Sequence, residues 1–109
     1  MKRVEFEVIL DKVGIERLRV KLKIDKGELT DVVYQYESFI NGKWTVIVRY
    51  DCAHGYFHRD IILPNGDKQK NEVLIDSLKD ASKYAEQDIK DRWEWYKENY
   101  LKKIKMKKR

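Results

Sequence analysis

The chain has 109 residues, with 24 Lys and Arg against 19 Asp and Glu, which gives a net charge of +5. Six of these bases stand in the last eight residues, 102–109, which contain no acid. Without that tail 18 bases face 19 acids, a net charge of −1. The body is therefore not a uniformly basic domain that coats nucleic acid.

The length predicts a single domain over 1–109. No apolar run approaches the roughly 20 residues of a membrane helix, and residues 1–20 lack the apolar region of a signal peptide. The single cysteine, Cys52, fits a reducing compartment, so we expect a cytoplasmic protein without membrane contact. The 39% of charged residues is typical of thermophilic proteins.

Apolar residues alternate with polar ones through most of 1–73, which predicts strands with one buried and one wet face. Short turns at 25–28, 41–42 and 64–67 each contain a glycine and favour pairing of consecutive strands. We expect five strands, or six if 68–73 returns as a short edge, and 12–17 could begin as a helical turn. The fold class is α+β: an antiparallel β-meander followed by one long C-terminal α-helix.

From Ser77 the apolar spacing becomes helical and predicts a helix over 77–105, with Ser77 and Asp80 as its capping pair. Such a helix would be roughly 43 Å long, whereas the expected radius of gyration is about 13 Å. We therefore expect the helix to overhang the sheet and to form an interface with a second copy or another protein. The alternative is a helix that frays or bends near Asn99. The interface would contain four aromatic residues: Trp93, Trp95, Tyr96 and Tyr100.

Segment 49–60 holds both histidines and the only cysteine, at the place where one strand ends and the next begins. His54 and His58 are four residues apart, so on an extended strand their Cα atoms would be roughly 13 Å apart. A shared metal ion would require the chain to fold back at Gly55, with Asp51 or Asp60 as a third ligand. We predict no metal and no cofactor.

The same segment has the residue types for metal-free RNA cleavage, which needs a base, an acid and a cation. The predicted catalytic residues are His54, His58, Arg49, Asp51 and Arg59. Tyr50 or Tyr56 would stack on a base. The structural alternative is that these groups cap a tight loop and form ion pairs across strands, while Cys52 packs as a small side chain.

The run from Trp44 to Arg59, W-T-V-I-V-R-Y-D-C-A-H-G-Y-F-H-R, resembles small prokaryotic proteins of unknown function. Those proteins have a strand that ends R-Y-D, a loop with H-G and a second histidine. The run is more distantly similar to the TumE-like toxins of toxin–antitoxin modules. The resemblance covers roughly residues 30–100 and implies a small antiparallel sheet with a helix, an intracellular location and pairing with an antitoxin. It also implies roles for Arg49, Tyr50, Asp51, His54, His58 and Arg59.

Two functions follow as hypotheses. The first is a toxin-like RNA-acting protein, a metal-independent ribonuclease whose basic tail attracts RNA in a salt-dependent way. That tail would contribute Lys102, Lys103, Lys105, Lys107, Lys108 and Arg109. The second is a noncatalytic protein that dimerises or binds a partner through its aromatic helix. The tail could equally be a solubilising last helical turn.

Overall fold

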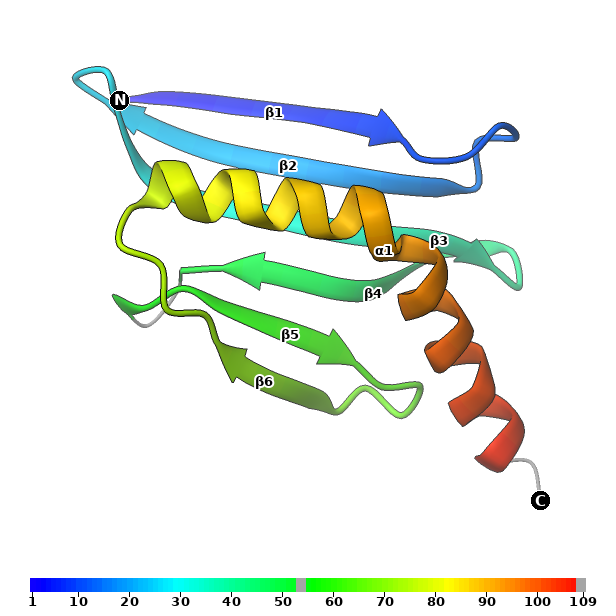
Figure 1. The fold of residues 1–109 in the computed structure, drawn as a ribbon. Coiled ribbons are helices and arrows are strands. Elements are labelled where there is room, and N and C mark those ends of the chain that lie inside the picture. The colour runs from blue at the N-terminus through cyan, green and yellow to red at the C-terminus, as the bar shows by residue number, and fades with distance from the viewer. Residues whose placement is uncertain (53–54, 108–109) are drawn as a thin grey trace.

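The computed structural model describes residues 1–52 and 55–107 and confirms the predicted α+β fold. Six strands form one antiparallel sheet in chain order (Figure 1). The sheet is followed by one helix, α1, over Leu78–Lys107. The strands are β1 (Lys2–Ile9), β2 (Glu16–Asp25), β3 (Glu28–Ile40), β4 (Lys43–Asp51), β5 (His58–Ile62) and β6 (Lys68–Glu72).

The turns explain why consecutive strands pair. The turns Lys26-Gly27 and Asn41-Gly42 have positive φ at both residues, as the type I′ turns of two-residue β-hairpins require. The alternative of a helical turn at 12–17 is not found: residues 11–14 form bends, and β2 begins at Glu16. The Asp11 carboxylate instead accepts hydrogen bonds from the backbone N–H groups of Gly14 and Ile15, which closes the loop before β2.

The core lies between α1 and one face of the sheet. Strand residues such as Leu18, Tyr36 and Val48 are buried against Ala85 and Ile89 of the helix. The helix begins one residue later than predicted, with Ser77 as its cap: the Ser77 hydroxyl accepts from the Asp80 N–H at 3.1 Å. The described residues contain no helix that is both long and apolar enough to cross a membrane.

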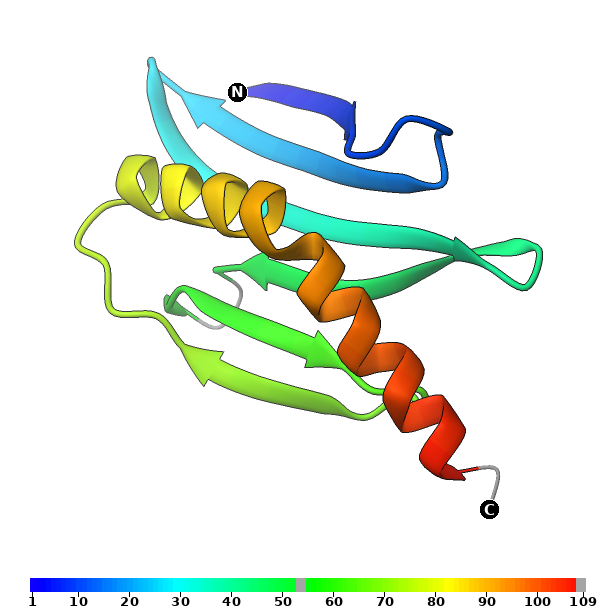
Figure 2. The same cartoon turned by 45° about the vertical axis from the view of Figure 1, so that its right-hand side comes forward.

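The last turns of α1 project past the sheet, as predicted, but most of the aromatic residues expected in that overhang pack against the sheet (Figures 1 and 2). Figures 1 and 2 show that α1 changes direction about midway, so its second half runs across β4 and β5. Tyr96 is only 2% exposed, and Trp93 and Tyr100 are half-buried against the same core, with Trp93 edge-on to Tyr36. Of the four predicted interface residues only Trp95, at 49%, is exposed. The chain's own sheet therefore covers most of the aromatic surface that had suggested a partner.

Candidate functional site

The register of β4 and β5 separates the predicted site residues onto two faces of the sheet. Arg49 lies opposite Asp60, and Asp51 lies opposite His58. Tyr50, between Arg49 and Asp51, donates a hydrogen bond to Asp88 of α1 and so faces the helix. Because successive strand residues alternate in direction, the other four side chains lie on the face that α1 leaves open.

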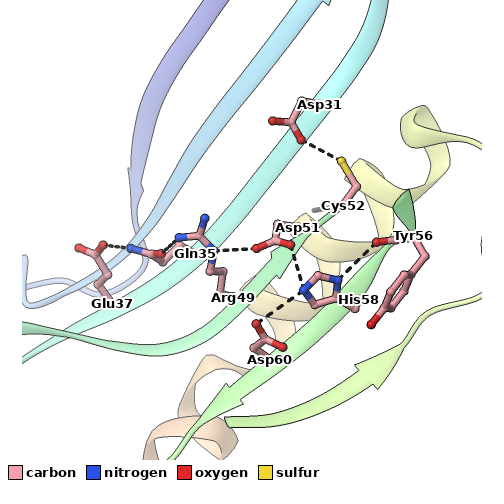
Figure 3. Close-up of polar contacts among 9 residues, drawn as sticks. All are labelled: Asp31, Gln35, Glu37, Arg49, Asp51, Cys52, Tyr56, His58 and Asp60. Carbon is pink, nitrogen blue, oxygen red and sulfur yellow. Dashed lines mark hydrogen bonds and ion pairs between the residues drawn. The ribbon is translucent and has the colours of Figure 1, made fainter. Parts of the chain in front are cut away.

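His58 stands at the centre of this group (Figure 3). Its Nε2 atom is 2.9 Å from Oδ1 of Asp51 and 3.6 Å from Oδ2 of Asp60. Its Nδ1 atom is 3.3 Å from the backbone carbonyl oxygen of Tyr56, and the Tyr56 ring lies against the imidazole at 5.2 Å between centroids. Although it lies on the open face, His58 is only 2% exposed. The imidazole is thus held between two carboxylates and away from water.

The group continues as a line of polar contacts across the sheet (Figure 3). Nε of Arg49 donates to Oδ2 of Asp51 at 2.8 Å, and its Nη1 donates to Oε1 of Gln35 at 2.9 Å. Gln35 in turn donates to Glu37, which also accepts from Arg17 at 2.8 Å. The line joins β2, β3, β4 and β5, and its contacts orient the Asp51 carboxylate from the side opposite His58.

Cys52 is held apart from this line. Its thiol donates a hydrogen bond to Oδ1 of Asp31 at 2.8 Å. Burial, with this hydrogen bond to a carboxylate, raises the pKa of the Cys52 thiol. A thiol that keeps its proton is a poor nucleophile, so the side chain fits the predicted packing role.

Several predicted catalytic and RNA-binding residues do not come together. Arg59 lies on the helix face and donates to the Tyr96 hydroxyl at 3.0 Å, so it cannot act beside His58. Tyr50 is 0% exposed and cannot stack on a base, whereas the Tyr56 ring is exposed at the surface. In the tail, Lys102 and Lys105 are exposed on α1 and Lys103 is half-buried. Other predicted positions lie outside the described residues or side chains: His54, Lys107, Lys108 and Arg109.

The helix face carries a second polar group that the sequence reasoning missed. Asp88 of α1 accepts from the hydroxyls of Tyr50, at 2.6 Å, and Tyr96. Burial, followed by these hydrogen bonds, raises the pKa of both tyrosines. Arg59 and Arg92 lie beside Tyr96 and balance the carboxylate charge. This group fastens α1 to β4 and β5, and only the folded helix brings it together.

The predicted catalytic residues did not include Asp60. It belongs with Arg49, Asp51 and His58 to the group on the sheet face that α1 leaves open, here called the open-face group. The signal for it was available in the sequence, because Asp60 follows His58 by two residues and shares its face, whereas Arg59 does not.

Comparisons with known proteins give a family but no activity. No curated protein and no solved structure matches the chain. A protein-family model matches the chain, and it does not support the resemblance to TumE-like toxins or the R-Y-D…H-G…H pattern. It covers residues 1–106 and is described as a domain of unknown function, DUF7718. The chain therefore belongs to the DUF7718 family.

Proposed function

We propose that this protein is a noncatalytic binding protein whose partner is a second copy of itself, joined through the edge strand β1. The observation that carries the proposal is the difference between the two sheet edges. All five residues of β6 are polar and exposed, the usual protection of a sheet edge against pairing. The β1 edge has eight residues and carries an apolar row.

The apolar row of β1 shares the face of the core residues Leu18 and Val20, and β1 itself lies at the sheet edge beside β2, away from β4 and β5 (Figure 1). Phe6 is opposite the core residue Val20, yet it is 43% exposed. Val4 and Val8, on the same side of the strand, are half-buried. A second β1, paired antiparallel, would extend the sheet and lay its own apolar row beside this one.

Charges on the other side of β1, together with the apolar row, favour one register. Arg3 lies opposite Lys23 of its own chain, a like-charge pair that leaves the guanidinium without a carboxylate across the strand. With a two-fold axis at Glu5, Arg3 of each copy faces Glu7 of the second copy, and Val4 faces Phe6. A shift of two residues in one direction would set Glu5 against Glu7, and a shift of two in the other would set Arg3 against Glu5 but Phe6 against Lys2. In the register centred on Glu5 the two Glu5 side chains face each other, and each keeps Lys21 of its own chain at 4.0 Å.

The open-face group supports binding over catalysis. A ribonuclease of the predicted kind needs an exposed base and acid beside a cation. His58 is buried with both ring nitrogens engaged, and Arg59 points to the other face. The described residues of segment 49–60 thus supply neither an accessible imidazole nor the second arginine.

Sedimentation velocity of two matched variants tests the proposal. Phe6→Lys and Trp95→Lys each introduce a charge at an aromatic residue of similar exposure, 43% and 49%. We expect the wild type and Trp95→Lys to sediment as dimers and Phe6→Lys as a monomer. A monomeric wild type would overturn the proposal. Loss of the dimer in Trp95→Lys alone would instead assign the interface to the helix.

A further inference from the structure

Three donor atoms on the open face converge at the spacing of metal ligands. The nearest donor atoms of Asp51, His58 and Asp60 all lie within 4.8 Å of one another. Nε2 of His58 is 2.9 Å from Asp51 and 3.6 Å from Asp60. Two ligands bound to one ion at about 2.0–2.2 Å are roughly 3.0–3.5 Å apart. An ion could therefore bind with little movement of β4 or β5.

The two ring nitrogens of His58 face different partners. Nδ1 lies 3.3 Å from the Tyr56 carbonyl oxygen, which is an acceptor. Nε2 lies on the side of the two carboxylates. A metal ion between Nε2 and these carboxylates would be a common partner of all three side chains. Donation from the other ring nitrogen to a backbone carbonyl is also the usual outer contact of a histidine that binds metal.

The Asp60 carboxylate gives a second, independent indication of a bound cation, because it is buried and incompletely hydrogen-bonded. It is 3% exposed, and its Oδ1 atom has no hydrogen-bond partner among residues 1–52 and 55–107. Its Oδ2 atom is 3.6 Å from His58, longer than a hydrogen bond. A buried carboxylate with so little compensation is costly, and a bound cation would remove that cost.

We propose that Asp51, His58 and Asp60 bind one divalent transition-metal ion of the zinc class. One imidazole with two carboxylates suits Zn²⁺ better than Mg²⁺ or Ca²⁺, which prefer oxygen ligands alone. Arg49 holds the second oxygen of Asp51 at 2.8 Å and so orients that ligand. Because the ligands come from the end of β4 and the start of β5, the ion would fasten these two strands together, and three protein ligands would leave one coordination position for water.

Calorimetric titration of the chelator-treated full chain with Zn²⁺ tests the site. We expect one Zn²⁺ per wild-type chain and no comparable binding of Mg²⁺. Asp60→Asn keeps the side-chain shape and removes the charge, and it should weaken Zn²⁺ binding at least tenfold. Asp31→Asn is the matched control, because Asp31 also interacts with a neighbouring side chain, Cys52, but lies outside the three-residue set. Its affinity should equal that of the wild type.

Absence of Zn²⁺ binding to the wild type would overturn the proposal. Equal affinity in Asp60→Asn would place the ion elsewhere. If Asp60→Asn fails to fold by far-ultraviolet circular dichroism, the Co²⁺ spectrum of the wild type decides. We expect tetrahedral or octahedral Co²⁺ bands without a thiolate charge-transfer band. A thiolate band would assign the metal to Cys52 and contradict the site.

Discussion

Replacing Tyr50 with Phe tests how α1 is fastened to the sheet. The Tyr50 hydroxyl is fully buried and donates to the Asp88 carboxylate at 2.6 Å. A hydrogen bond to a charged group contributes about 1.5–3 kcal/mol to stability. Asp88 keeps the hydroxyl of Tyr96 and a 3.4 Å contact with Arg92, so its charge stays partly compensated. We therefore expect Tyr50→Phe to lose about 1.5–2 kcal/mol, at the lower end of that range.

Urea unfolding followed by circular dichroism measures this loss of unfolding free energy. In a domain of this size, the same loss should lower the melting temperature by roughly 6–12 °C. Tyr84→Phe is the control: the Tyr84 ring packs edge-on against Tyr50, but its hydroxyl makes no hydrogen bond within the described part of the chain. We expect the control to stay within about 0.5 kcal/mol of the wild type. Equal stability of the two variants would refute the role given to Asp88.

Three further predictions concern alkaline stability, the helix cap and toxicity. Burial raises the pKa of four tyrosines: Tyr34, Tyr36, Tyr50 and Tyr96. The unfolded chain loses these protons near pH 10 while the folded chain keeps them. The free energy of unfolding, measured by urea titration, should therefore fall as the pH rises above about 10, and an unchanged value at about pH 11 would contradict this prediction. Ser77→Ala should cost about 1 kcal/mol in thermal unfolding and Ser77→Asp much less, and equal losses would argue against the cap. Induced expression of the wild type and of His58→Ala should give equal growth and intact cellular RNA; slowed growth with the wild type alone would favour the ribonuclease.

Local chemistry was sufficient to predict the fold. The period-two pattern and the Asn41-Gly42 turn specify neighbouring antiparallel strands, and Ser77 marks the start of the helix. The second half of α1 was not predictable in the same way. Whether Tyr96 is buried depends on the direction that the helix takes across the sheet, and sequence spacing does not specify that direction.

The candidate site was predicted only in part, because residues were grouped by their distance in sequence. Alternation within β5 separates Arg59 from His58 and joins His58 to Asp60. That rule was available for β5 alone, whereas placing Asp51 beside His58 requires the register of β4 against β5. The burial of His58 on an otherwise open face was not available from pattern at all, since it depends on neighbouring side chains such as Tyr56.

The most direct test of the β1 dimer is a charge-reversal set measured by sedimentation equilibrium. Arg3→Glu sets like charges against Glu7 of the second copy, and Glu7→Arg does the same against Arg3. The double variant restores opposite charges in the register centred on Glu5. We predict weaker dimers for each single variant and recovery in the double variant. Single variants that dimerise as well as the wild type, or a double variant no better than either single one, would contradict the pairing.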